Sequence, residues 1–190
     1  MMHYTGNRTM KKWLLLAACI LLTGCEDVLV LEKLPPLQDD RLVGTWATAA
    51  DPDDIGVIEK SGDGYTMRSS NPNGERVKLT LARAGSVEFA QVEEKCSNHV
   101  FSFTGDTRTC YRMVRIEFEG DALTFWQLDL DKLRNTPNLD VQYRLATAQP
   151  RRGDKTSCAL IDAPLPEVVA FLAGYPMDGY KEGDRMVRRK

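Results

Sequence analysis

Short runs of alternating hydrophobic and polar residues fill the middle of the chain. Val77, Leu79 and Leu81 alternate with Lys78 and Thr80. The same period of two returns in residues 87–90, 114–118, 123–125 and 141–145. A hydrophobic residue at every second position is typical of a β-strand that buries one of its faces. We therefore predict a series of short strands, beginning near residue 41.

Turn residues between these runs favour antiparallel hairpins. Residues 61–64 read Ser-Gly-Asp-Gly and residues 71–74 read Asn-Pro-Asn-Gly, and such residues adopt the backbone angles of tight turns. Near the end of the chain the period changes, because Val168, Phe171, Leu172 and Tyr175 have helical spacing and predict a helix over 166–174. The sequence thus predicts a mainly β fold, an antiparallel up-and-down barrel with a C-terminal α-helix. A β-sandwich is the alternative.

The first 25 residues have a different character. Lys11 and Lys12 precede an apolar run from Trp13 to Leu22. Ten residues are too few to cross a bilayer, which takes about 20, and a short apolar run behind a basic start is typical of a signal peptide. The following Leu-Thr-Gly-Cys of residues 22–25 resembles the lipobox of bacterial lipoproteins. The resemblance implies cleavage before Cys25 and lipidation of that cysteine.

This start suggests a division of the chain and a location. We expect a signal peptide at 1–24, a lipid-anchored tether at 25–40, a barrel at 41–148 and a C-terminal extension at 149–190. Glu26 stands where an aspartate would resemble an inner-membrane retention signal. We therefore expect a lipid anchor on the periplasmic face of the bacterial outer membrane, with the inner membrane as the alternative.

One motif at the start of the predicted barrel resembles the lipocalin family. Gly44 and Trp46 fit the Gly-any-Trp signature of the first lipocalin strand. The resemblance implies a lipocalin-like barrel in which an arginine from the last strand packs across the tryptophan. Arg144 is the candidate, because it lies in the last alternating run, and a cation over an indole ring is favourable. The roles of Gly44, Trp46 and Arg144 would then be structural.

Three cysteines remain after the signal peptide and Cys25 are set aside. An oxidising periplasm preserves disulfides, and Cys96 and Cys110 flank a polar segment between two predicted strands. Closing a ring of about 15 residues stabilises a fold by about 3 kcal/mol. We predict this pair, although a bond from Cys158 to either cysteine stays open.

Charge and residue usage argue against several classes of function. Without residues 1–24 the chain has 22 Lys and Arg against 27 Asp and Glu, which disfavours a nucleic-acid partner. The one histidine after the leader, His99, stands alone. No sequence motif of a nucleophile, a phosphate loop or a metal site is present. We expect no enzyme activity, no catalytic residue, no cofactor and no metal.

Two hypotheses for function remain, and the space inside the barrel separates them. A lipocalin-like barrel implies a carrier of a small apolar ligand, whereas a barrel filled by side chains favours an envelope protein that binds another protein, such as an inhibitor, an immunity protein or an accessory factor. The candidate pocket residues are the large side chains expected to point inward: Leu79, Leu81, Phe89, Ile116, Phe118, Phe125 and Tyr143. For protein binding, residues 97–109 are the first surface to test.

Overall fold

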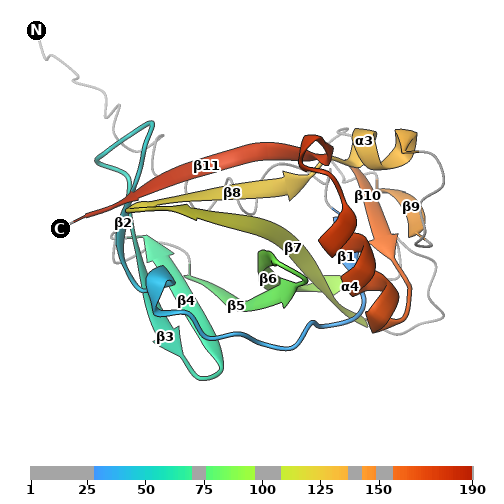
Figure 1. The fold of residues 1–190 in the computed structure, drawn as a ribbon, viewed down its shortest axis with the longest axis horizontal. Helices are drawn as coiled ribbons and strands as arrows, with labels where there is room; N and C mark the ends of the chain where they lie inside the picture. The colour runs from blue at the N-terminus through green and yellow to red at the C-terminus, as the bar shows by residue number, and fades with distance from the viewer. Residues whose placement is uncertain (1–27, 70–75, 97–107, 137–142, 149–155, 190) are drawn as a thin grey trace, which may run out of the picture.

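A computed structural model describes residues 28–69, 76–96, 108–136, 143–148 and 156–189. The strands of this part are β1 (Val28–Val30), β2 (Gly44–Thr48), β3 (Ile55–Ser61), β4 (Gly64–Ser69), β5 (Arg76–Ala84), β6 (Val87–Cys96), β7 (Arg108–Glu119), β8 (Ala122–Leu128), β9 (Tyr143–Ala148), β10 (Thr156–Ile161) and β11 (Tyr180–Arg188). The helices are α3 (Leu130–Asn135) and α4 (Leu165–Gly174), with 3₁₀ turns η1 (Asp40–Leu42) and η2 (Met177–Gly179). Figure 1 shows their arrangement.

Eight strands form a closed antiparallel barrel. Strands β2 to β8 follow one another around it, β11 joins β8 to β2, and β6 pairs with β7. Tight glycine turns connect several neighbours, and Gly62, Gly85 and Gly120 adopt the positive φ that such turns require. The predicted up-and-down barrel is confirmed, and its closure rules out the β-sandwich alternative.

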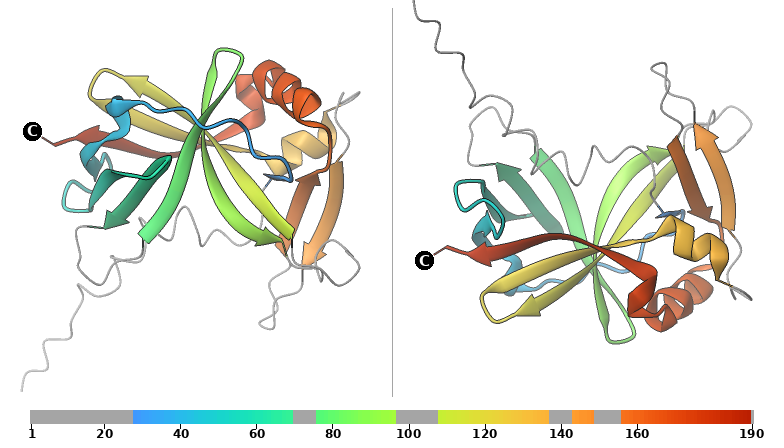
Figure 2. Two further views of the ribbon diagram at one scale, coloured as in Figure 1. Left: turned by 90° about the horizontal axis from the view of Figure 1, so that it is seen from below. Right: turned by 90° about the horizontal axis from the view of Figure 1, so that it is seen from above.

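The last barrel strand comes from the predicted extension, so the predicted boundary at residue 148 is wrong. β11 pairs with β8 and β2. The run around Tyr143 instead forms β9, which pairs with β10 beside the barrel (Figure 2). The sequence did not predict β11, because most of its side chains are exposed and polar and do not alternate. Its register also shifts between Glu182 and Arg185.

The predicted C-terminal helix is confirmed as α4, which begins one residue early, at Leu165. Pro166 suits the first turn because a proline there lacks only a hydrogen that the helix does not use. Val168 and Leu172 are fully buried and place α4 on the outside of the barrel. Among the described residues, no helix has the length and apolar character to cross a membrane.

Two hydrophobic clusters stabilise the molecule. The first, which we call the barrel core, lies inside the ring of strands and contains Leu42, Trp46, Ile58, Tyr65, Met67, Val77, Leu79, Leu81, Ala90, Val92, Val114, Ile116, Leu123, Phe125 and Met186. The second, the outer core, joins the outer barrel wall to α3, α4, β1 and β10. Strands β5 to β8 thus bury side chains on both of their faces.

Residues 28–39 are docked along the barrel, so the described part of the predicted tether is not a free spacer. β1 pairs with β7 and β10. Farther along, Leu34 is fully buried, and the Leu37 amide donates to the Leu81 carbonyl at 2.7 Å. Pro35 and Pro36 have no amide hydrogen, and they lie between Leu34 and Leu37 in the sequence. The extended proline segment therefore lies along the barrel wall.

Candidate functional site

Large side chains occupy the interior of the barrel, where the sequence predicted the ligand pocket. Leu79, Leu81, Ile116 and Phe125 belong to the barrel core, each at most 6% exposed. Phe118 packs against that core and is partly buried. Four of the seven candidates therefore lie inside as predicted, and they fill space there together with Trp46, Tyr65 and Met67.

The other two candidates, Phe89 and Tyr143, lie outside the barrel, so their predicted place is wrong. In β6, Ala90 and Val92 point into the barrel core, which turns Phe89 to the outer core. Both faces of this strand are buried, so alternation in the sequence could not show which face was the inner one. Tyr143 packs against the outer core from β9.

Three cavities formed by described residues are open to the surface. One of about 210 Å³ is lined by polar side chains that include Lys33, Asp63, Gln91 and Glu93. A second of about 250 Å³ lies beside Arg41, Glu88, Arg115 and Glu117. The third, of about 510 Å³, is bordered by Ala47, Ala49, Pro52, Val187 and Arg189. Their openness makes them surface depressions, unlike an enclosed lipocalin-type pocket.

One end of the barrel is closed by Trp46 and an arginine, as the lipocalin resemblance implied, but the arginine is Arg188. The Trp46 side chain is fully buried, and its Nε1 donates to the Leu42 carbonyl at 2.9 Å. The Arg188 guanidinium carbon lies 4.4 Å from the centre of the indole ring. Arg188 also donates to the carbonyl oxygens of Val43, at 2.6 Å, and Arg41.

Gly44 makes room for this packing. Its φ is 148°, and a Cβ there would collide with Nη1 of Arg188. Arg144, the predicted partner of Trp46, lies in β9 outside the barrel. That prediction is wrong because the last strand of the barrel is β11 and not the strand of Arg144. The resemblance implied an arginine from the last barrel strand, and Arg188 lies in β11. The structural roles of Gly44 and Trp46 fit the rule.

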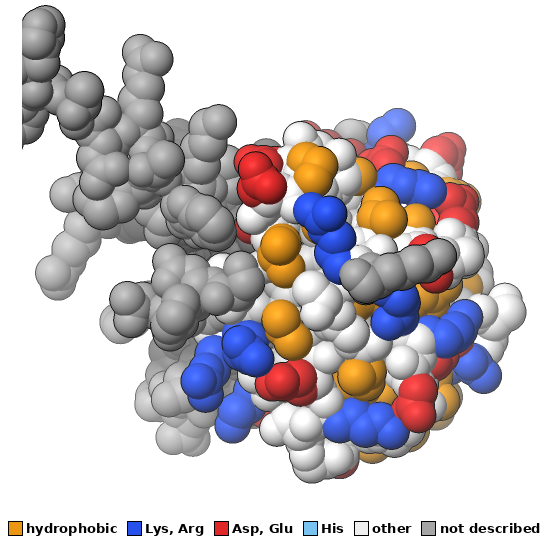
Figure 3. All heavy atoms as spheres, turned by 90° about the vertical axis from the view of Figure 1, so that its left-hand side faces the viewer, with side chains coloured by type: hydrophobic (Ala, Val, Ile, Leu, Met, Phe, Trp, Pro, Cys, Tyr) orange, Lys and Arg blue, Asp and Glu red, His pale blue; other side chains and the backbone are white. Residues whose placement is uncertain are grey.

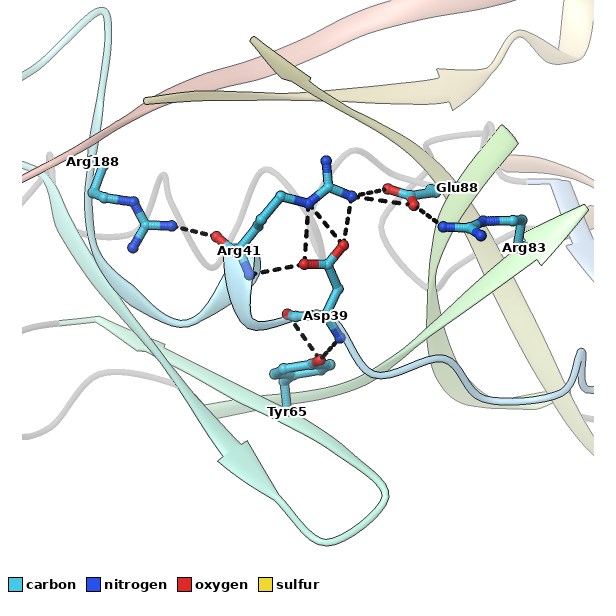
Figure 4. A network of polar contacts seen from close by, with 6 residues as sticks. All are labelled: Asp39, Arg41, Tyr65, Arg83, Glu88 and Arg188. Carbon is cyan, nitrogen blue, oxygen red and sulfur yellow. Dashed lines mark hydrogen bonds and ion pairs between the residues drawn. The ribbon is translucent and has the colours of Figure 1, made fainter. Parts of the chain in front are cut away.

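A network of charged residues holds η1 over the same end (Figure 4). Arg41 bonds to Asp39 through Nε at 2.8 Å and to Glu88 through Nη2 at 3.0 Å. Arg83 also donates to Glu88 at 2.5 Å, and the Tyr65 hydroxyl donates to the Asp39 carbonyl at 3.0 Å. The hydrogen bond from Arg41 lowers the pKa of Asp39. Charges of both signs neutralise one another, so this network stabilises the barrel end.

A second polar anchor fixes the N-terminal segment to the barrel wall. Gln91 is 1% exposed. Its Oε1 accepts from the Leu34 amide at 2.8 Å, and its Nε2 donates to the Leu34 carbonyl at 3.1 Å. This pair of bonds satisfies the backbone of a fully buried residue. Nothing in the sequence distinguishes Gln91 from the other polar residues of the strand 87–96.

Several predicted site residues lie outside the described part of the chain. These are Cys25, His99 and residues 97–107, as well as the side chains of Cys96 and Cys158. Cys110 is fully buried and is disulfide-bonded. Since the side chain of Cys96 is not described, the pairing of Cys96 with Cys110 remains a prediction.

The titratable groups of the described residues suggest no metal centre. No group of three His, Cys, Asp or Glu side chains in this part of the chain could hold an ion. Burial raises the pKa of Asp184, and burial together with the nearby charges of Asp51 and Asp184 raises the pKa of Asp54, against a hydrogen bond from Thr48. These carboxylates are half-buried beside the β2–β3 turn.

The end of the molecule around the last strand carries a mixed surface. In Figure 3, hydrophobic side chains on this face lie among Lys and Arg side chains. Val187 is 41% exposed, although it is a large hydrophobic residue. It borders the depression of about 510 Å³ together with Pro52 and Arg189. Among the described residues, Val187 is the one large hydrophobic side chain that is exposed, and it lies next to this depression.

Comparisons with known proteins found no relative of this chain. No family model, no curated protein and no solved structure matches this chain. The fold and the contacts of its residues therefore carry the argument for function.

Proposed function

We propose that this protein is a non-catalytic bacterial lipoprotein of the cell envelope that binds another protein through the outer surface of its barrel. The observation that supports protein binding best is the filled barrel core, in which Trp46, Ile58, Leu81 and Leu123 are fully buried. A carrier needs a cavity for its ligand, on the order of 300 Å³ or more. The alternative, a carrier of a small apolar ligand, has less support, since the described cavities open at the surface.

The proposed lipid anchor at Cys25 would hold the barrel close to the bilayer. Cys25 precedes Val28 by three residues, and an extended chain spans about 3.5 Å per residue. β1, which begins at Val28, is fixed by pairing with β7 and β10. The anchor would therefore leave the barrel about 10 Å of reach. We propose the periplasmic face of the outer membrane as the location, with the inner membrane as the alternative.

This geometry suggests which surface would meet a partner. β1 and β10 lie at one end of the molecule, and the C-terminal end of β11 lies at the other (Figure 1). With the β1 end near the lipid, the surface around Val187, Pro52 and Arg189 would point away from the membrane. We call these three residues the distal patch, and we propose it as the binding surface.

A first experiment tests the anchor. Cells that express the full chain are labelled with a palmitate analogue, and the wild type is compared with Cys25→Ser and Cys158→Ser. We expect Cys25→Ser to remain an unprocessed precursor without label, and Cys158→Ser to behave as the wild type. Normal maturation of Cys25→Ser would refute the anchor.

A second experiment tests binding. A photo-crosslinking residue is placed at Val187 or, as a control on another exposed position, at Arg76, and crosslinks are made in intact cells. We expect one discrete protein adduct from position 187 alone, which co-expressed wild-type protein suppresses by competition and co-expressed Val187→Asp does not. A stoichiometric apolar small molecule extracted from the purified protein, with no adduct, would favour the carrier.

A further inference from the structure

Three hydrogen-bond donors are buried together on the outer wall of the barrel. They are Arg115 Nε, Trp126 Nε1 and the Tyr180 hydroxyl, and each is enclosed with no hydrogen-bond partner among the residues that the structure describes. Buried donors in native proteins nearly always have an acceptor, because losing the hydrogen bonds made to water is costly. The described residues supply no acceptor for this group, and a bound molecule with acceptor oxygens would complete it.

The sheet brings the three side chains to one place. Arg115 and Trp126 face each other directly across β7 and β8, and side chains in that position lie about 5 Å apart at their Cβ atoms. The Arg115 guanidinium carbon lies 5.5 Å from the centre of the Tyr180 ring. Tyr180 is 7% exposed and packs edge-on against Tyr175 at 5.8 Å. The three donors therefore lie close together on the outer face of the barrel wall, next to the outer core.

The chemistry of the three donors indicates which kind of group would bind them. A guanidinium and an indole nitrogen only donate hydrogen bonds, and a carboxylate only accepts them, with two oxygens able to serve three donors. Glu117 already binds Nη2 of Arg115 at 2.5 Å, which leaves Nε directed elsewhere. Aromatic rings continue from the site, since Tyr175 packs against Tyr180 and Phe171 packs against Tyr175.

Of the three residues, Arg115 also borders an open cavity at the surface. This residue lines the cavity of about 250 Å³, together with Val87 and Glu117, and its side chain is 18% exposed. Arg115 therefore belongs both to this open cavity and to the group of buried donors. We propose that Arg115, Trp126 and Tyr180 bind the carboxylate of a small organic acid. This inference is independent of the proposed partner surface, which lies on other residues.

Nuclear magnetic resonance on the full mature protein, lipidated and held in detergent, tests the proposal. After Cys25 the chain has two tryptophans, so two indole N–H signals are expected. Trp46 is an internal control, because its Nε1 already donates to Leu42. On titration with benzoate we expect a saturable shift of the Trp126 signal and no shift of the Trp46 signal. Benzamide, which has the same ring without the charge, should bind at least tenfold more weakly.

Variants make the test specific. Tyr180→Phe keeps the ring and removes one donor, so we expect affinity for benzoate to fall at least tenfold. Tyr175→Phe is the matched control: it is the neighbouring buried tyrosine, its hydroxyl contacts Thr136, and it should change affinity less than twofold. A linear, non-saturating shift would mean that water fills the site and would overturn the proposal. Equal binding by Tyr180→Phe would overturn it too.

Discussion

Removing the Arg188 side chain should loosen the end of the barrel where the chain closes on itself. Arg188→Ala deletes the cation over Trp46 and the donors to the carbonyls of Val43 and Arg41. A cation on an aromatic ring contributes about 0.5–1 kcal/mol at a partly exposed site, and each hydrogen bond about 1 kcal/mol. We expect the free energy of unfolding to fall by about 2–3 kcal/mol.

Urea unfolding followed by tryptophan fluorescence measures this loss, and thermal unfolding repeats it. For a chain of this size, each kcal/mol lowers the melting temperature by about 2–4 °C. Arg185→Ala is the matched control on the same strand, because its pair with Glu119 is exposed and such pairs contribute about 0–1 kcal/mol. Equal losses in the two variants would contradict the role of Arg188.

A double-mutant cycle with Gly44 makes the test sharper. Gly44→Ala adds a Cβ that meets Arg188 Nη1, and it also strains the backbone at a φ of 148°. In the Arg188→Ala background the collision disappears and the strain remains, so the two losses should not add. Additive losses would show that a glycine is needed at position 44 only for its backbone angle, and not to leave room for Arg188.

Three further predictions concern the core, the docked segment and pH. Leu81→Ala, at a fully buried site of the barrel core, should lower the free energy of unfolding by about 2–5 kcal/mol in urea; a loss under 1 kcal/mol would mean that the interior is not tightly packed. Gln91→Ala leaves the buried Leu34 amide and carbonyl without their partner, so hydrogen exchange at Leu34 should quicken far more than at Leu81. Burial raises the pKa of Asp184 above its ordinary 3.8, so the folded state holds this proton more tightly and loses stability as the pH rises through the raised pKa. Asp184→Asn should therefore be more stable than the wild type at pH 7 and similar near pH 3; a variant equally destabilised at both values would disprove this reading.

The parts of the fold that could be predicted are those with local signals. Strands β2 to β8 alternate in polarity and are joined by turn residues, and α4 has helical spacing between two prolines. The family resemblance at Gly44 and Trp46 also implied the closed end, and it rests on a motif of three consecutive residues. What failed depends on contacts between residues far apart in the sequence.

Two failures show this physical limit. Leu34 and Gln91 are 57 residues apart, so nothing near residues 35 and 36 shows that the proline segment is bound. Likewise, β11 has few buried side chains, and its place in the barrel comes from pairing with strands 50 to 140 residues earlier. The donor group of Arg115, Trp126 and Tyr180 is non-local in the same way.

The side chains of β11 separate the two tasks that we assign to this strand. Met186 is buried in the barrel core and Arg188 lies on Trp46, whereas Val187, between them, points outward and is 41% exposed. Alternation along a strand puts neighbours on opposite faces, so a change at residue 187 leaves the closure of the barrel intact. Val187→Asp should therefore unfold at the same urea concentration as the wild type and still lose the partner. If it lost stability as Arg188→Ala does, the loss of binding would say nothing about the distal patch.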